Sequence, residues 1–564
     1  AWVLPNLSGK GTRVEKVVAP AEANRPILVD LGQGLRLAYS PWVPMDRDDR
    51  TLPHRVTPQP LPLEGEDIAL PFSEQSLSNL VVFTRAYGHL RWFQPTDAAS
   101  QTDWDRAVIA GMAPMAAVKD TTELRERLRT FFGIIAPRAQ FLAPGEEPAP
   151  LMAPEGTARY QRWVHVGGYE LSEKIRPHQG PKRASRLAAV VITWNLLRHF
   201  SPYLEPVQKE WEAALEQGLR DAATASDDAA FLHGFRTFTA NFRDGHIFPR
   251  MESCLQRSFS LPFYVAQAEG RAFVQRVGPN QDPRLTPGSE ILSVGGEEAN
   301  ARLARIASEV GPTNLGHQQR GAEIMFIGLP TDQAVSVRWR TPLGEVIEAN
   351  LNGRKAYVAP RDPKTPVREL ESGLWYVDVT RDIPDENETL ARLAQAKGLV
   401  VDLRGYPSSD FTKKLLSRLI DAPIHNPLMA YPVVRTPERE ALNWKSAPGS
   451  VVVPKGPRFR AKVAFLIDGE AISYAETLLS MVEAYRLGEL VGEPTTGTNG
   501  NAASARLPGG VDLNWTGLRV LRHDGSVFHQ IGIRPTVPVT RTVKGLKEGR
   551  DEALEAAVKA VQQR

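Results

Sequence analysis

From residue 373 to its end, the sequence alternates between short apolar runs and segments with helical periodicity, and this alternation limits the possible folds more than any other feature. The expected strands cover residues 373–379, 398–405 and 462–468. The expected helices cover residues 386–396, 410–420 and 474–487 and the stretch from residue 551 to the end. Strands that alternate with helices pack as a sheet layered with helices. We therefore predict an α/β domain over residues 366–564.

The segment from Glu74 to about residue 250 resembles a duplicated helical unit. Displacing the chain by 107 positions, without a gap, superimposes similar residues along this segment. The superimposed pairs are Leu80 and Leu187, Phe93 and Phe200, Pro95 and Pro202, Trp104 and Trp211, Leu124 and Phe231, and Leu128 and Phe235. Each copy is expected to hold a long helix, a bend marked by proline and two further amphipathic helices. We predict copy 1 over residues 71–150 and copy 2 over residues 151–254.

The two copies differ at a histidine. The second copy ends in NFRDGHIFPR, which contains His246, whereas Ala139 takes the equivalent place in the first copy. A residue that is present in only one copy is less expected to be a packing requirement of the unit. A lone histidine at the end of a helix more often bonds to backbone than takes part in catalysis, so both interpretations of His246 stay open on this evidence.

Two further segments have the character of strands. Residues 1–70 mix short apolar runs with many prolines and charges, which predicts short strands and loops. Residues 255–355 contain LTPGSEILSVGGEEANARLARI, an apolar strand between glycine-containing turns that is followed by an amphipathic helix. We expect a separate β-rich domain over residues 255–355.

Length, charge and cysteine content exclude several classes of protein. A chain of 564 residues has room for roughly three to four domains. A net charge of +3 provides no field that would gather phosphates, so we expect no nucleic-acid partner. Cys254 is the one cysteine, which excludes an internal disulfide, and the usual zinc-binding spacings are missing, so we expect no metal. No apolar run is as long as a membrane span, and the first residues lack an initiator Met and a signal series, so we expect a processed or cloned form.

Ser473 stands where the expected strand 462–468 gives way to the helix 474–487. With Glu476 it forms S-x-x-E, the capping-box pattern, in which the two side chains satisfy free backbone N–H groups at the start of a helix. Taken alone, this motif favours a structural cap. The wider sequence context favours a different role.

Four motifs follow one another around this serine: DLRGYPSS at 402–409, SYAE at 473–476, GEPTTGT at 492–498 and GIRP at 532–535. Their order resembles the catalytic domain of the C-terminal-processing (tail-specific) and tricorn core serine peptidases. LTPGSEILSVGG also resembles the core of a PDZ domain, which binds an extended peptide at a sheet edge. With the DGH motif, the resemblance covers about residues 185–560. It implies a multidomain α+β fold with a duplicated helical N-terminal region, a PDZ-like β domain and an α/β catalytic domain of the ClpP/crotonase-like type.

The resemblance gives the central chemistry to a serine and a histidine. It implies that Ser473 attacks a peptide carbonyl. Processing peptidases use a lysine 25 positions after the nucleophile as base, but Thr498 stands there, and its hydroxyl cannot serve as a general base near neutral pH. Tricorn-type members instead use a histidine ahead of the PDZ segment, a place that His246 matches. An ordinary histidine pKa near 6.5 suits proton transfer to and from a substrate.

The resemblance also implies donors for the negatively charged oxygen of the intermediate. The N–H of Tyr474, at the start of the helix, is expected to be one donor. A second is expected from the loop around Ser408 and Ser409, where family members usually carry two glycines. Glu476 and Thr498 are expected to support this arrangement.

The sequence leaves open which residue orients His246. Tricorn-type members place a glutamate where this chain has His529. Three alternatives remain: His529 replaces the glutamate, His529 is itself the base, or another carboxylate orients His246. The first is preferred. Asp244 is expected to cap or shape the turn that contains His246.

The resulting hypothesis is a serine peptidase that needs no metal or organic cofactor and acts on polypeptide or peptide substrates, which the PDZ-like domain would engage. A homo-oligomer is left open. One alternative is a catalytically inactive peptide-binding scaffold, favoured by the missing lysine, glycines and glutamate. Another is an acyl hydrolase that acts on glutamine or on esters. The resemblance to exported enzymes implies a periplasmic or extracellular location, and a cytoplasmic one stays open.

Overall fold

The computed structural model describes residues 12–18, 25–44, 67–68, 71–151, 159–166, 182–255, 259–279, 281–355, 366–439 and 442–562. Of the strand-rich segment predicted over residues 1–70, four short strands lie in the described part, and the rest of that segment lies outside it. These strands are β1 (Thr12–Val18), β2 (Ile27–Gly32), β3 (Leu35–Tyr39) and β4 (Val43–Pro44).

The C-terminal part is built on a six-stranded sheet. Its strands are β16 (Val367–Glu371), β17 (Leu374–Asp378), β18 (Gly398–Asp402), β23 (Lys462–Ile467), β24 (Glu489–Gly492) and β28 (Val537–Pro538), in this spatial order. All neighbours are parallel except β16, which pairs antiparallel with β17 at the edge. The carboxyl ends of the parallel strands therefore meet at one rim of the sheet, where α/β proteins place their ligands.

Helices cover both faces of this sheet, because its strands are apolar on both sides. One face carries α11 (Glu386–Leu393), α12 (Phe411–Leu416) and α13 (Tyr474–Tyr485), and the other carries α15 (Glu552–Gln562). Val401 and Phe465 belong to the core under the first face, whereas their neighbours Val400 and Ala464 belong to the core under α15. The predicted strands 373–379, 398–405 and 462–468 correspond to β17, β18 and β23, and the predicted helices to α11, α12, α13 and α15, whereas β16, β24 and β28 were not predicted.

The helices of the N-terminal half occur in two sets. The first set is α1 (Glu74–Phe93), α2 (Asp97–Gln101), α3 (Trp104–Ala116) and α4 (Thr121–Gly133), and the second is α5 (Lys182–Phe200), α6 (Gln208–Thr224) and α7 (Asp228–Ala240). α4 and α7 both contain 13 residues and begin 107 positions apart. In the second set, Trp194 and Trp211 each donate an indole N–H to the other's backbone carbonyl at 3.1 Å. Tyr87 and Trp104, at the equivalent positions of the first set, are joined by a hydrogen bond from the phenol to the carbonyl.

Residues 263–352 form a separate antiparallel sheet. Its order is β15 (Val346–Asn352), β14 (Ala334–Arg340), β11 (Glu290–Val294), β10 (Arg271–Val277) and β9 (Phe263–Ala268). The helices α9 (Ala299–Glu309) and α10 (Leu315–Phe326) pack on it and share its apolar core. The β-rich character expected here is present, and the more specific PDZ resemblance stays a prediction.

Strands from the C-terminal part also complete the helical half. β20 (Leu428–Val434) and β21 (Asn443–Ser446) extend a sheet with β6 (Arg159–Val166) and β1, while β25 (Ala502–Leu507) and β26 (Val511–Thr516) pair with β7 (Arg250–Met251). Leu513 and Trp515 are buried in the same core as the helices of both sets. The predicted helical copies (71–254) and part of the predicted catalytic domain (366–564) therefore share one hydrophobic core, whereas the core under the smaller sheet stays within residues 255–355.

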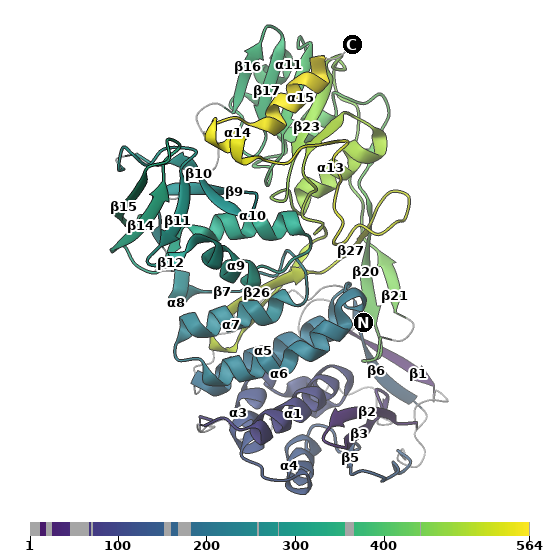
Figure 1. Cartoon of the computed structure of the whole chain (residues 1–564). Helices are drawn as coiled ribbons and strands as arrows, with labels where there is room; N and C mark the ends of the chain where they lie inside the picture. The colour runs from purple at the N-terminus through teal and green to yellow at the C-terminus, as the bar shows by residue number, and fades with distance from the viewer. Residues whose placement is uncertain are drawn as a thin grey trace.

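The remaining short elements connect these parts. They are β5 (Gln140–Leu142), α8 (Glu252–Leu255), β8 (Phe259–Ser260), β12 (Glu297–Glu298), β13 (Gly328–Leu329), β19 (Ile424–His425), β22 (Val451–Val452), β27 (Arg519–Leu521) and α14 (Val543–Lys547). In Figure 1 the six-stranded sheet lies at the top, the smaller sheet at its side and the helices α1 to α7 below, with β7 and β26 between them. β7 and β26 thus lie where the three parts meet.

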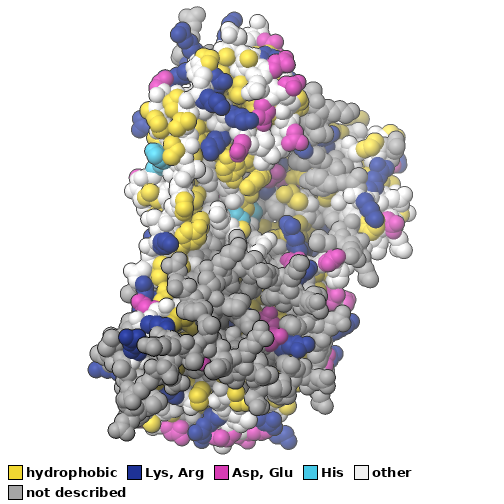
Figure 2. Space-filling view, turned by 180° about the vertical axis from the view of Figure 1, so that it is seen from behind, with side chains coloured by type: hydrophobic (Ala, Val, Ile, Leu, Met, Phe, Trp, Pro, Cys, Tyr) yellow, Lys and Arg dark blue, Asp and Glu magenta, His cyan; other side chains and the backbone are white. Residues whose placement is uncertain are grey.

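Among the coloured residues of Figure 2, basic and acidic side chains are interspersed over the visible face. Across the part of the chain that the structure describes, every helix is too short or too polar to span a bilayer.

Candidate active site

Ser473 occupies the turn between β23 and α13 in an unusual conformation. Its backbone has φ 58° and ψ −112°, a region that residues other than glycine rarely adopt. Its N–H donates to the carbonyl of Thr498 at 2.9 Å, and its partly exposed side chain makes no capping hydrogen bond to the helix. The capping box expected from S-x-x-E is therefore not formed by Ser473. Strained backbone of this kind clusters at functional sites.

Glu476 organises the turn that lies against the nucleophile. The fully buried carboxylate accepts hydrogen bonds from Thr495 Oγ1 at 2.5 Å, from Gly497 N–H at 2.7 Å and from Thr498 N–H at 2.9 Å. Burial raises the pKa of Glu476 to about 7, and these donors oppose the rise. Glu476 thus fixes the 495–498 turn beside Ser473.

The DGH turn (residues 244–246), which follows α7, contacts the 495–498 turn although the two are about 250 positions apart in the sequence. The N–H of Gly245 donates to Thr498 Oγ1 at 3.1 Å. Since the Thr498 carbonyl accepts from Ser473, Thr498 contacts both the DGH turn and the nucleophile turn. Within the described residues no hydrogen bond joins the Ser473 hydroxyl to His246 directly. Thr498 therefore links the two turns that carry Ser473 and His246.

His246 is held by a residue that the sequence did not single out. Its Nδ1 lies 2.7 Å from Thr516 Oγ1, and 12% of its side chain is exposed. Thr516 ends β26, and this strand pairs with β7 directly after the DGH turn. Burial lowers the pKa of His246, and the Asp244 carboxylate partly offsets that effect.

His529 lies close to these groups without bonding to them. Its ring stacks on Tyr203 with centroids 3.7 Å apart, and neither buried ring nitrogen has a hydrogen-bond partner within the described protein. Burial lowers the pKa of His529 to about 4. A neutral ring without a bond to His246 does not perform the orienting role that the sequence analysis preferred for it.

In the loop expected to contribute to the oxyanion site, some of the polar groups are already hydrogen-bonded. The N–H of Ser408 donates to the carbonyl of Val379 at 3.1 Å, and the Ser409 hydroxyl donates to Glu386 at 3.2 Å. Neither serine has a positive φ; in this loop Gly405 takes that conformation, with φ 137°. Among the described residues, the N–H of Tyr474 has no acceptor. Its phenol donates to Asp410 at 3.1 Å.

The residues at the start of α10, which packs on the smaller sheet, contact the nucleophile region directly. The hydroxyl of Thr313 donates to the Thr496 carbonyl at 2.5 Å, and the amide of Asn314 donates to the carbonyls of Thr495 and Thr496 at 2.6 and 3.0 Å. One turn further along, the half-buried His317 lies near Gly245, and desolvation lowers its pKa to about 4. The smaller domain therefore supports the same turn as Glu476.

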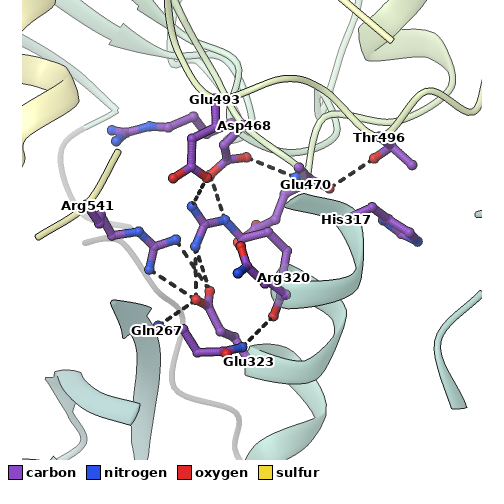
Figure 3. A network of polar contacts seen from close by, with 12 residues as sticks. Gln267, His317, Arg320, Glu323, Asp468, Glu470, Glu493, Thr496 and Arg541 are labelled. Carbon is purple, nitrogen blue, oxygen red and sulfur yellow. Dashed lines mark hydrogen bonds and ion pairs between the residues drawn. The ribbon is translucent and has the colours of Figure 1, made fainter. Parts of the chain in front are cut away.

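An ion-pair network anchors α10 further along its length (Figure 3). Arg320, 6% exposed, contacts Glu323 on its own helix at 2.9 Å and reaches Glu493 at 2.7 Å and Asp468 at 3.4 Å. Glu323 also pairs with Arg541 at 3.3 Å. Neither this network nor Thr516 could be predicted from the sequence, because single arginines and threonines carry no motif that would mark them.

The structure contains no three His, Cys, Asp or Glu side chains grouped as metal ligands within the described part of the chain. The turns that meet at Thr498 carry a hydroxyl (Ser473), an imidazole (His246) and a buried carboxylate (Glu476), and the N–H of Tyr474 has no acceptor among the described residues. This set suits acyl transfer, in which a hydroxyl attacks a carbonyl with the help of a base.

Comparison with known proteins agrees with this geometry. Residues 379–539 match peptidase family S41. The structure resembles that of mature CPAF complexed with lactacystin, with 14% sequence identity, a TM-score of 0.54 and coverage of 67% of this chain and 97% of that one.

Two more solved structures match less closely overall. The photosystem II D1 C-terminal processing protease is 14% identical, with a TM-score of 0.38 and coverage of 67% of this chain and 98% of that one. The tricorn protease is 14% identical, with a TM-score of 0.36 and coverage of 67% and 36%. No curated protein matches the chain. The match of residues 379–539 to peptidase family S41 and the fold shared with mature CPAF support a serine-type peptidase.

Proposed function

We propose that the protein hydrolyses peptide bonds of polypeptides through an acyl-enzyme on Ser473, with His246 as general base. One observation carries the proposal: the DGH turn and the nucleophile turn, which are far apart in sequence, both bond to Thr498. This arrangement supports a hydroxyl and an imidazole acting on one substrate carbonyl.

The reaction would proceed in two steps. The Ser473 oxygen attacks the carbonyl carbon while Nε2 of His246 takes the hydroxyl proton and then gives it to the leaving amine. A water molecule next attacks the ester, and His246 takes a proton from that water and returns it to Ser473. Each step regenerates the neutral imidazole, so no cofactor is consumed.

The oxyanion would be held by backbone N–H groups. The N–H of Tyr474 at the start of α13 has no other acceptor among the described residues, and the helix dipole favours negative charge there. Because the N–H of Ser408 is bonded to Val379, we assign the second donor to the N–H of Ser409, the next residue in that loop. Loss of one such donor commonly costs a hundredfold to a thousandfold in rate.

The smaller sheet would engage the polypeptide at the edge strand β9, in the manner proposed for a PDZ-like domain. In the structure the N–H of Gln267 on that strand donates to the Glu323 carboxylate at 2.6 Å. A peptide that adds a strand at this point would have to displace Glu323 from Gln267.

The test uses the purified protein with an unfolded polypeptide and a fluorophosphonate that labels reactive serines. Ser473→Ala and His246→Ala are each expected to lower the cleavage rate by a thousandfold or more, and Ser473→Ala to abolish labelling. The matched controls Ser446→Ala and His425→Ala change exposed residues outside the site and are expected to cleave normally.

Other outcomes would support the alternatives. Undiminished cleavage by Ser473→Ala would refute the assignment of the nucleophile. Peptide binding without turnover by the unaltered protein and both variants would support a scaffold. Turnover of small esters without cleavage of polypeptides would support an acyl hydrolase.

A further inference from the structure

We propose that Asp244 positions His246 for catalysis through the hydroxyl of Thr516, so that this carboxylate and this hydroxyl together replace the missing glutamate. The proposal rests on the proposed function, because it names the residues that orient its base. It gives a chemical role to a carboxylate that the sequence analysis expected only to shape a turn.

A continuous line of hydrogen bonds joins the three side chains. Thr516 Oγ1 lies 2.7 Å from His246 Nδ1 and 2.7 Å from Asp244 Oδ1. The backbone N–H of Thr516 donates to Asp244 Oδ2 at 2.7 Å, and the backbone N–H of His246 donates to Asp244 Oδ1 at 3.0 Å. Asp244 and Thr516 are both fully buried. Hydrogen bonds from backbone N–H groups as well as from side chains therefore hold Asp244, Thr516 and His246 in place.

The direction of these bonds determines which ring nitrogen carries the proton. A carboxylate only accepts, so the single hydroxyl proton of Thr516 points to Asp244. The Thr516 oxygen then accepts from His246, which requires a proton on Nδ1 of the ring. Nε2 is left with a free lone pair, which is the form of histidine that can take a proton from a serine hydroxyl.

The same arrangement stabilises the imidazolium that forms during the reaction. Asp244 Oδ1 lies 3.9 Å from His246 Nδ1, so a full negative charge stands near the ring in a buried environment. His529 and His317 also lie near this carboxylate, and both are neutral rings at neutral pH because burial lowers their pKa to about 4. Neither can supply the negative charge that Asp244 supplies.

The first test removes the hydroxyl and then restores it. Thr516→Val keeps the shape of the side chain and is expected to lower kcat a hundredfold to ten-thousandfold, with KM little changed. Thr516→Ser restores the hydroxyl and is expected to recover kcat to within about tenfold. Thr237→Val removes a threonine hydroxyl from α7, outside the site, and is the matched control.

Asp244→Asn tests the direction of the bonds. The asparagine amide can donate to Thr516, which would turn the hydroxyl proton toward His246 and leave Nδ1 without a proton. We expect kcat to fall as far as in Thr516→Val. A variant that keeps the unaltered kcat at either position would overturn the proposal.

The second test reads the ring directly and does not need activity. Nitrogen-15 NMR of histidine-labelled protein, with His246→Gln to assign the signal, is expected to show His246 protonated on Nδ1 at neutral pH. In Thr516→Val this preference is expected to be lost. A ring protonated on Nε2 in the unaltered protein would refute the proposal even if the enzyme cleaves. A protonated Nδ1 in a protein that never cleaves would uphold the orientation and count against the proposed function alone.

Discussion

At the scale of single residues, the burial of His246 sets the acid limit of the reaction. Burial lowers its pKa below the ordinary 6.5, with Asp244 opposing part of the change. Because the neutral ring is the active base, activity is lost as pH falls through this lowered pKa. We expect the acid limb of a plot of kcat/KM against pH to have its midpoint below 6.5. A midpoint at or above 6.5 would contradict the burial of the base in the free enzyme.

Gly245 is required where the two turns touch. A Cβ at this position would lie 2.8 Å from Thr498 Oγ1 and 2.9 Å from Thr496 Cγ2. Gly245→Ala must therefore push the DGH turn away from the nucleophile turn, and we expect kcat to fall at least tenfold, since small displacements of catalytic groups are costly. Gly133→Ala, where a Cβ meets nothing within 4 Å, is the control and should leave kcat unchanged.

The sequence predicted residues of the site only where they carry a motif. Ser473 and His246 stand in SYAE and DGH, so both were singled out, although nothing in spacing showed that they share a neighbour. Thr516 could not be found in this way, because its role depends on a strand pairing between β26 and β7. His529 was chosen by position in a motif, and its stacking on Tyr203 became visible only in three dimensions.

At the scale of elements, α10 is fastened to the catalytic sheet by charge. Arg320 is nearly buried and holds Glu323, Glu493 and Asp468. Arg320→Ala would leave these carboxylates without their shared partner, and we expect the free energy of unfolding to fall by about 3–5 kcal/mol. Urea denaturation followed by circular dichroism measures this loss.

Arg305→Ala on α9 provides the matched control for that variant. Arg305 pairs with Glu297 at 2.8 Å, but 44% of its side chain is exposed, so its removal should cost about 1 kcal/mol or less. Equal losses for the two variants would show that the Arg320 network does not stabilise the docking of α10.

The elements themselves were predictable where their pattern is local. The strands and helices that were predicted after residue 373 follow from apolar runs and helical periodicity, and each forms within its own segment. The pairing of β20 with β6, and of β26 with β7, joins residues more than 250 positions apart. Local pattern contains no information on such pairing, so the predicted domain boundaries missed it.

At the scale of the whole molecule, three buried histidines of the helical half, in addition to His529 of the site, tie stability to pH. His89 and His199 have rings 5.5 Å apart, His165 Nε2 lies 2.8 Å from the Trp92 carbonyl, and His199 Nδ1 lies 3.3 Å from the Pro437 carbonyl beyond β20. Burial lowers the pKa of all three, that of His165 to about 4. The folded protein therefore leaves these rings neutral at a pH where the unfolded chain already binds protons on them.

This difference gives the sign of the effect: where the unfolded state binds more protons, the free energy of unfolding decreases as the pH is lowered. Each ring is expected to lower the free energy of unfolding by about 1.4 kcal/mol for each pH unit below about 6.5. Urea denaturation at about pH 7 and about pH 5.5 should show this loss, and His165→Gln should reduce the dependence on pH by one ring's share whatever it does to stability at neutral pH. An unchanged dependence in that variant would mean that His165 takes up its proton in the folded state as readily as in the unfolded chain. His165 and His199 lie where β6 meets β20 and the residues that follow it. If these rings take up protons only on unfolding, we expect acid to loosen the contact between the helical half and the catalytic part first.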